Sequence, residues 1–221
     1  MPASPTPPAA AAVAAPRWER RKESRPSELL AAALELFVER GYAATRLDDI
    51  AARAGVSKGT LYLYFANKEE LFKALVRENI VTMLDAFRER IEGSGEPASA
   101  LIRSFVQCWW TDFGATRLSG ICKLIVSEAG NFPEVARFFH DEVIRPNDAL
   151  LASVVVRGVA SGEFRPVDVE AAVQLWIAPL VMKAIWTHSF ELGQPGGVTV
   201  APERMIDTHI DLILASLRPA P

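Results

Sequence analysis

Residues 55–65 read GVSKGTLYLYF, and this stretch decides the fold. After a tight turn at Ala54-Gly55, it continues as a short helix crowded with small, hydroxyl, aromatic and basic side chains. Just upstream, TRLDDIAARA at residues 45–54 reads as another short helix. Two short helices joined by a few residues that include glycine form a helix-turn-helix, whose second helix lies in the major groove of DNA. The pattern therefore predicts DNA as a partner.

A helix is also predicted on the N-terminal side of this pair. It should begin near Pro26, with Ser24 as its cap, and carry an apolar stripe of Leu30, Leu34 and Phe37. Gly41 then stands where a helix C-cap requires left-handed backbone, which glycine adopts most easily.

The second and third helices each have a hydroxyl residue at their start. Thr45 is expected to begin the second helix, because Thr45-x-x-Asp48 resembles a capping box with aspartate in place of glutamate. Ser57 is expected to cap the third helix. The apolar residues that should face the core of this unit are Ile50, Ala54, Leu61 and Phe65.

Further helices are predicted to fill the rest of the chain. Asn67 should cap a long fourth helix that runs from Lys68 to about Ile91, with an inner face of Leu71, Phe72, Leu75 and Val76. After a break at 93–97, five helical segments follow at about 97–113, 117–129, 133–161, 168–191 and 201–217, with Pro146 and Pro179 expected to kink or interrupt two of them. Strand-like alternation is missing, so the predicted fold class is all-α.

The distribution of charge favours a DNA-binding head on a separate body. The 221-residue chain has a formal net charge of −3. Residues 17–77 hold 12 basic and 9 acidic side chains, whereas the remainder holds 12 basic and 18 acidic ones. A mildly basic N-terminal part on an acidic body fits DNA binding by the head alone.

Composition argues against several other classes of protein. Charges and prolines interrupt the apolar runs well before the ~20 residues of a membrane span, so no membrane partner is expected. Residues 1–16 are rich in alanine and proline, but basic residues follow them instead of preceding them, which predicts a disordered tail and a cytoplasmic protein. Cys108 and Cys122 lie in apolar helical contexts without a CxxC pair, so neither a metal site, a cofactor nor a disulfide is expected.

The order of features at residues 26–77 resembles the TetR family of bacterial transcription regulators. The matching segments are AALELF at 32–37, GYAAT at 41–45, DIA at 49–51, AGVSKGTLY at 54–62 and YF at 64–65 followed by NKEEL at 67–71. The match is dense and ordered over about fifty residues. The remainder of the chain resembles the family in being helical and of suitable length.

The resemblance implies an all-α homodimer in three parts. Residues 1–25 would be a disordered tail ending in a basic arm, 26–77 the three-helix DNA-binding head, and 78–221 a helical body for ligand binding and dimerisation. The free protein would occupy a palindromic operator, and a small effector would release it. Arg46 departs from the family pattern, in which serine or threonine is frequent, and could add a phosphate contact or alter the helix cap.

The residues expected to meet DNA lie on the second, third and fourth helices. Hydroxyls and free N–H groups at helix starts suit phosphate, Lys58 suits phosphate or guanine, and Gly59 allows close approach to the groove. Thr45 and Ser57 could also act as helix caps alone, and Tyr64 is more inclined to pack than Tyr62. The predicted DNA-binding residues are Thr45, Arg46, Ser57, Lys58, Gly59, Thr60, Tyr62, Tyr64 and Lys68. The basic arm is Arg17, Arg20, Arg21, Lys22 and Arg25, which could equally be a solvated charge run.

The body is rich in aromatic side chains that suit a pocket for a hydrophobic or aromatic effector. The predicted ligand-binding residues are Phe105, Trp109, Phe113, Trp176, Trp186 and His188, although ordinary core packing would explain each one singly. The last two helices are expected to pair with their copies in a second subunit. Their apolar stripes, which could instead fill the intrachain core, are Val169, Ala172, Val173, Trp176, Leu180 and Ala184 on one helix, and Ile206, Ile210, Ile213 and Leu214 on the other.

Three other functions are alternatives to a repressor. An enzyme is disfavoured because the three histidines, His140, His188 and His209, belong to no nucleophile motif, phosphate loop or metal cluster, and no catalytic residue is predicted. A constitutive DNA-binding protein would have the same head but no cavity and no release by ligand. An activator of the same fold stays open on sequence alone.

Overall fold

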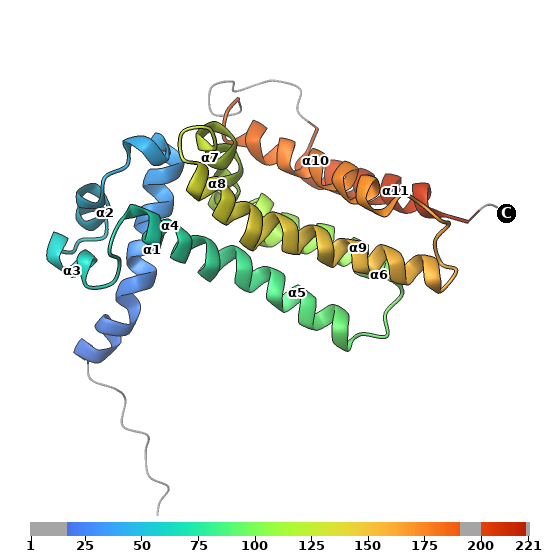
Figure 1. Cartoon of the computed structure of the whole chain (residues 1–221), viewed down its shortest axis with the longest axis horizontal. Coiled ribbons are helices and arrows are strands. Elements are labelled where there is room, and N and C mark those ends of the chain that lie inside the picture. Colours follow the sequence, from blue (N-terminus) through green and yellow to red (C-terminus); the bar gives the residue numbers. More distant parts are fainter. Residues whose placement is uncertain (1–16, 191–199, 220–221) are drawn as a thin grey trace, which may run out of the picture.

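The computed structural model describes residues 17–190 and 200–219, and every regular element in these two ranges is a helix. Figure 1 shows a head of three helices beside an elongated helical body. The helices of the head are α1 (Arg17–Ala44), α2 (Leu47–Arg53) and α3 (Lys58–Tyr62). The prediction of an all-α fold is confirmed.

One long helical stretch leaves the head and runs along the body (Figure 1). It consists of α4 (Lys68–Val76), a π-helical turn η1 (Arg77–Val81) and α5 (Thr82–Gly93). Asn67 caps it as predicted, because its side chain accepts a hydrogen bond from the Glu70 N–H at 2.8 Å. We call residues 68–93 the connecting helix.

The body contains five longer helices and several short ones. The longer ones are α6 (Ala98–Cys108), α7 (Gly120–Glu128), α9 (Arg145–Ala160), α10 (Val169–Thr187) and α11 (Pro202–Leu217). Between them lie η2 (Trp109–Gly114), η3 (Arg117–Ser119), α8 (Pro133–Phe139) and η4 (His140–Ile144). The two predicted prolines have different effects: Pro146 lies in the first turn of α9, and α10 continues through Pro179.

The first helix starts earlier than predicted. Residues 17–25 form the first turns of α1 and are not a disordered arm, so Pro26 lies inside the helix. A proline removes a single backbone hydrogen bond, and the arginine-, lysine- and glutamate-rich run before it favours helix. The tail of residues 1–16 and the predicted loop at 193–197 lie outside the described residues. Gly41 breaks α1 at the predicted place, with φ of 84°.

A continuous apolar core joins head and body. In the head, Phe37, Tyr42 and Phe72 pack against one another with ring centroids 5.4–5.8 Å apart. Tyr42 also meets Phe132 of the body at 4.8 Å. The predicted inner face of the connecting helix is confirmed, because Leu71, Phe72, Leu75 and Val76 are all at most 1% exposed.

Helix α10 is apolar on more than one face. Its predicted dimer residues Val173, Trp176, Leu180 and Ala184 are buried within the chain, as are Ile206, Ile210 and Ile213 of α11. A different row of α10, at helical spacing, lies exposed, and its large members are Leu175 (71%), Met182 (58%) and Trp186 (46%). Among the described residues, α10 is the one helix that is long and apolar enough to cross a membrane by length and composition alone, with a mean hydropathy of 1.3. No such helix was predicted from the sequence.

Candidate DNA interface and effector cavity

The third helix has one side fixed to the core and the other facing solvent. Ser57 accepts a hydrogen bond from the Thr60 N–H at 3.1 Å, which confirms it as the cap of α3. Leu61 is fully buried and Phe65 is 8% exposed, so the predicted inward pair is confirmed. These contacts fix which residues of the helix face outward.

Three of the predicted DNA contacts stand together on the outward side of α3. Lys58 and Gly59 are exposed, Tyr62 is 46% exposed, and the Lys58 ammonium lies 5.9 Å from the centre of the Tyr62 ring. Lys58 also pairs with Asp48 of α2 at 2.9 Å. The hydrogen bond from Asp48 raises the pKa of Lys58, so the cation is retained.

The remaining residues of α2 and α3 differ in how open they are. Arg46 is exposed at the N-cap position of α2, where its side chain makes no capping hydrogen bond. Thr60 is half-buried beside Ser57, with their hydroxyl oxygens 2.8 Å apart. Tyr64 packs against the core, as predicted for one of the two tyrosines. As DNA contacts, Arg46, Ser57 and Thr60 stay predictions.

Thr45 corrects the sequence analysis. It was expected to cap α2 and to meet DNA, but its side chain is 1% exposed and α2 begins two residues later. Its hydroxyl donates to the carbonyl oxygens of Gly41 at 2.7 Å and Leu36 at 3.2 Å. The broken end of α1 leaves carbonyls without helical partners, and Thr45 satisfies them. The Thr45 side chain therefore does not reach DNA.

Lys68 is a second correction, because it was expected on a phosphate. Its ammonium donates to the carbonyl oxygens of Tyr42 (2.6 Å), Thr45 (3.1 Å) and Ala43 (3.2 Å). It also lies 4.4 Å from the centre of the Tyr42 ring. Burial lowers the pKa of Lys68, and the Glu128 carboxylate opposes this. With three carbonyls on its three donors, Lys68 holds the α1–α2 junction on the connecting helix.

Lys68→Met should destabilise the protein and not weaken one phosphate contact. We expect a loss of about 1–3 kcal/mol in the free energy of unfolding, because partly buried carbonyls lose their donor. Denaturant unfolding measures it, with Lys73→Met as the control, since Lys73 forms side-chain ion pairs with Glu69 and Glu70 on its own helix and lies 5.7 Å from the centre of the Phe138 ring. If Lys68→Met instead lowers the salt dependence of DNA binding and leaves the stability unchanged, Lys68 contacts a phosphate.

The head is fixed to the body through its outer charges. Arg53 of α2 pairs with Glu35 at 2.7 Å and Glu39 at 3.2 Å on α1. Arg117 of the body lies 3.8 Å from the same Glu35. The Glu128 carboxylate of α7 accepts a hydrogen bond from the Ala43 N–H at 3.1 Å, beyond the break in α1. A shift of α7 would therefore displace the end of α1 in the head.

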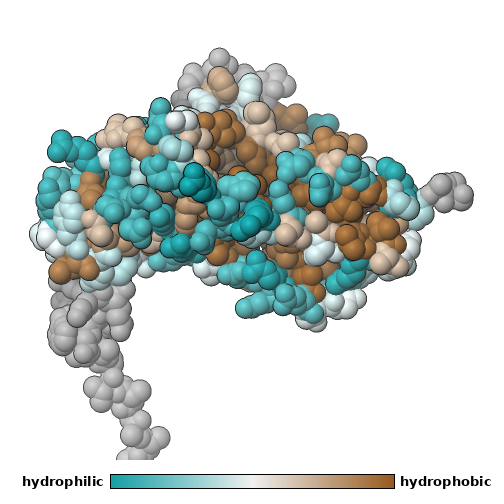
Figure 2. All heavy atoms as spheres, viewed as in Figure 1, coloured by the Kyte–Doolittle hydropathy of each residue, from teal (hydrophilic) through white to brown (hydrophobic). Residues whose placement is uncertain are grey.

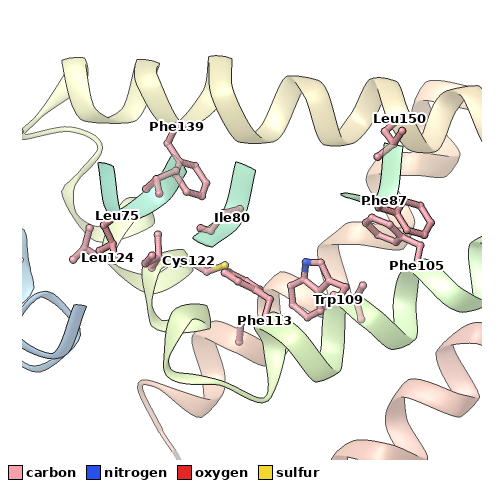
Figure 3. Close-up of a cluster of buried hydrophobic side chains, with 14 of the residues drawn as sticks. Leu75, Ile80, Phe87, Phe105, Trp109, Phe113, Cys122, Leu124, Phe139 and Leu150 are labelled. Atoms are coloured by element: carbon pink, nitrogen blue, oxygen red, sulfur yellow. The ribbon is translucent and has the colours of Figure 1, made fainter. Parts of the chain in front are cut away.

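The body has a cavity of about 570 Å³ along the connecting helix. Phe105 and Trp109, which were predicted to bind ligand, both line it. Figure 3 shows Phe87 of α5 next to Phe105 of α6, and their ring centroids are 5.0 Å apart. The other apolar lining residues are Met83, Leu84, Ala86, Cys108 and Leu118, and the polar ones are Glu78, Asn79, Thr82, Arg90 and Asp112. We call this space the outer cavity.

A smaller space of about 90 Å³ lies next to the outer cavity. The two share Met83, Leu84 and Trp109 as lining residues. The third predicted ligand residue, Phe113, lines the smaller space together with Cys122 and Phe139, and Figure 3 shows these side chains clustered. We call this space the inner cavity.

Three predicted ligand residues lie away from both cavities. Trp176 is buried in the core, and its carbonyl lies 2.8 Å from Nε2 of His209 on α11. Trp186 is exposed and packs on Phe190, with the ring centroids 4.6 Å apart. His188 follows the end of α10, where its Nε2 is 2.8 Å from the Ser119 hydroxyl. These three positions correct the sequence analysis.

The connecting helix contributes to the cavity wall, which was not predicted from the sequence. Met83, Leu84 and Phe87 line the outer cavity from α5. Their apolar spacing of three and four residues was a usable signal for a second inward face beyond Val76. Within residues 17–190 and 200–219, no group of three His, Cys, Asp or Glu residues could hold a metal ion.

A helix-turn-helix with a free recognition face, joined by one helix to a body that encloses a cavity, defines a DNA-binding regulator with an effector domain. Two family models match: "Bacterial regulatory proteins, tetR family" over residues 29–75 and "Tetracyclin repressor-like, C-terminal domain" over residues 99–194. The chain belongs to the TetR family of transcription regulators.

Named relatives agree with this assignment. The transcriptional repressor KstR2 of Rhodococcus jostii is 30% identical over 198 residues, 89% of this chain and 92% of that protein. The transcriptional activator FasR of Mycolicibacterium smegmatis is 43% identical over 76 residues, 34% of this chain and 32% of that protein. The crystal structure of FadR from Bacillus subtilis in complex with stearoyl-CoA matches with a TM-score of 0.71 and 20% identity, covering 87% of this chain and 99% of that one.

Proposed function

We propose that the protein is a repressor that binds a palindromic operator as a dimer and is released by a hydrophobic effector. One observation carries the proposal: the connecting helix packs on the head with Leu71 and Phe72 and walls the outer cavity with Leu84 and Phe87. An effector in the cavity therefore contacts the helix that holds the head. It acts only through its different affinities for DNA-competent and DNA-incompetent dimers.

The division of labour follows the predicted boundaries. Residues 26–77 would bind operator DNA in the cytoplasm, and residues 78–221 would bind the effector and form the dimer. Lys58, Gly59, Thr60 and Tyr62 would enter the major groove. Within the described residues, no membrane contact or catalytic step is needed for this function.

The effector class is proposed from the shape and chemistry of the cavity. Its inner part is lined mostly by apolar side chains, with Asn147 and Asp148 as the polar members. Glu78, Arg90 and Asp112 are the charged residues that line its outer part. A molecule with a long apolar chain and a polar end fits this pattern. The FadR structure with stearoyl-CoA supports acyl thioesters as the first class to test.

The dimer interface is proposed on the exposed apolar row of α10. Leu175, Met182 and Trp186 form one stripe, and such a patch marks a protein contact. Two copies related by a two-fold axis would bury this stripe in a bundle with α11. The same contact accounts for the apolar character of α10 without a membrane.

Binding of the protein to the DNA upstream of its own gene tests the function. Fluorescence anisotropy at several salt concentrations should show tight, sequence-specific binding, which stearoyl-CoA or another hydrophobic compound relieves. Specific binding that no compound relieves would indicate a constitutive DNA-binding protein. Specific binding with increased transcription of the adjacent gene would favour the second candidate, an activator, which the relative FasR supports.

Cys108 offers a direct probe of the effector site. Cys108 lines the outer cavity and is half-buried, whereas burial raises the pKa of Cys122 to about 12. N-ethylmaleimide should therefore modify Cys108 at least about tenfold faster than Cys122, because the thiolate is the reactive form. Saturating stearoyl-CoA should slow the reaction of Cys108, measured by mass spectrometry. If a compound releases the protein from DNA but leaves the rate of Cys108 modification by N-ethylmaleimide unchanged, the effector binds outside this cavity.

A further inference from the structure

Three π-helical turns interrupt the helices of the body. Each is defined by a backbone hydrogen bond to the fifth residue back: Thr82 N–H to Arg77 O, Ala115 N–H to Trp110 O at 2.7 Å, and Arg145 N–H to His140 O. Such turns are rare and are frequently found at functional sites. Their positions in this protein are therefore informative.

All three turns line the inner cavity. Ile80 comes from η1, Trp109 and Phe113 from η2, and Val143 and Ile144 from η4. Figure 3 shows Ile80, Phe113 and Trp109 around the same space. Helices η1 and η4 are in contact, and the Arg77–Glu142 ion pair at 3.1 Å bridges them. Five of the thirteen residues that line the inner cavity thus come from the three segments whose helical register is irregular.

The inner cavity is too small for an effector as it stands. Its volume of about 90 Å³ is well below the ~300–1,000 Å³ of ligand pockets, whereas the adjoining outer cavity falls within that range. An apolar chain that enters past Met83 and Trp109 must therefore move the walls.

A π-turn can yield without losing a backbone hydrogen bond. Its N–H groups exchange an acceptor five residues back for one four residues back, so the helix that follows advances by one residue. In an α-helix this step is ~1.5 Å along the axis and ~100° about it. Because η1 separates α4, which packs on the head, from α5, which walls the cavity, such a step would turn the head relative to the body.

Side chains hold the turn in the connecting helix. The Asn79 amide donates to the Leu75 carbonyl at 2.9 Å, the acceptor that an α-helical Asn79 N–H would use. The Thr82 hydroxyl donates to the Arg77 carbonyl at 3.1 Å. Asn79 and Thr82 also line the outer cavity, so a bound effector lies against both.

We propose that the inner cavity is an expandable chamber of the effector site, which opens at its three π-turns when an apolar chain enters. The η1 turn is the joint that passes this expansion to the head, and Asn79 is the positioning residue that holds it. The proposal deepens the proposed function and rests on it for the identity of the chain that enters.

Hydrogen exchange of single amides tests the chamber in two arms. In the first, stearoyl-CoA is added to the wild-type protein. In the second, which needs no effector, the chamber is filled by Cys122→Phe, or by Cys122→Leu if the larger residue prevents folding. In both arms the exchange rates of the amides in residues 77–82, 110–115 and 140–145 should change together, by at least about threefold. The exchange rates of the amides in 150–158 of α9 should stay unchanged. A change spread evenly over the body, or confined to one turn, would overturn the proposal.

Substitution of Asn79 tests the joint. Asn79→Ala should shift the affinities for operator DNA and for stearoyl-CoA in opposite directions, each by at least about threefold, because it biases one equilibrium that both partners share. Glu89→Ala, at an exposed position of α5, is the control. A parallel loss of both affinities would mark a merely structural residue and refute the joint. Wild-type protein that does not bind stearoyl-CoA would instead refute the effector class, and the Cys122 variants would then decide the chamber.

Discussion

Gly59→Leu should weaken specific operator binding at least about 30-fold and leave the fold intact. Gly59 lies in the exposed first turn of α3, and a Cβ there would meet only the Ser57 hydroxyl, at 3.8 Å. A side chain is therefore free of steric conflict in the isolated protein, and leucine favours helix over glycine by up to about 1 kcal/mol. On DNA the same side chain would separate the recognition helix from the base edges.

The expected size of the effect follows from the dimer. A loss of ~1–3 kcal/mol per recognition helix gives about 2–6 kcal/mol for two, or roughly 30-fold to 10⁴-fold in the dissociation constant. Anisotropy with operator and scrambled DNA measures it, and Gly59→Ala should show a smaller loss. Gly130→Leu is the matched control, because its Cβ also meets open space but lies on the body. Full operator affinity in Gly59→Leu would contradict the placement of α3 in the groove.

Leu175→Glu should convert the dimer into monomers. Leu175 is 71% exposed and is the first large residue of the apolar row of α10, so a single chain tolerates a charge there. A two-fold interface would bring two such carboxylates together in an apolar setting, and burying unpaired charge costs several kcal/mol. Operator affinity should fall with dimerisation, because the two half-sites are no longer read together.

Analytical ultracentrifugation at micromolar concentration measures the mass. Val126→Glu is the control, because Val126 of α7 is 66% exposed and lies outside the row. If the Leu175→Glu variant remains a dimer and the Val126→Glu variant is a monomer, the interface lies on α7.

The head was readable from sequence because its signals are local. The cap of α3 joins Ser57 to Thr60, the cap of α4 joins Asn67 to Glu70, and the break at Gly41 needs only one left-handed residue. Each is fixed by residues at most three apart, so a linear pattern contains the whole interaction.

The roles of Thr45 and Lys68 were not readable in this way. Their partners are backbone carbonyls at the α1–α2 junction, which lie 23 to 26 residues from Lys68 in the sequence. The sequence around a lysine at a helix start in a DNA-binding head is the same whether the lysine contacts a phosphate or a backbone carbonyl. Only the packing of α4 against α1 selects between them.

The aromatic residues of the body show the same limit. Helix α10 is apolar on both its buried and its exposed faces, so periodicity could not tell the core row of Trp176 from the outer row of Trp186. The cavity could be anticipated on α6 and η2, from which Phe105 and Trp109 line it, but its opposite wall on α5 required the path of the connecting helix.

The sequence by itself determined the helix-turn-helix, its caps, the all-α class and the family, because short-range hydrogen bonds and helical spacing specify them. The tertiary structure alone decided which polar side chains face solvent, which apolar row meets a second subunit, and where three π-turns surround one cavity. These features depend on contacts between segments far apart in the chain, and no local pattern records which face of a helix such a contact covers.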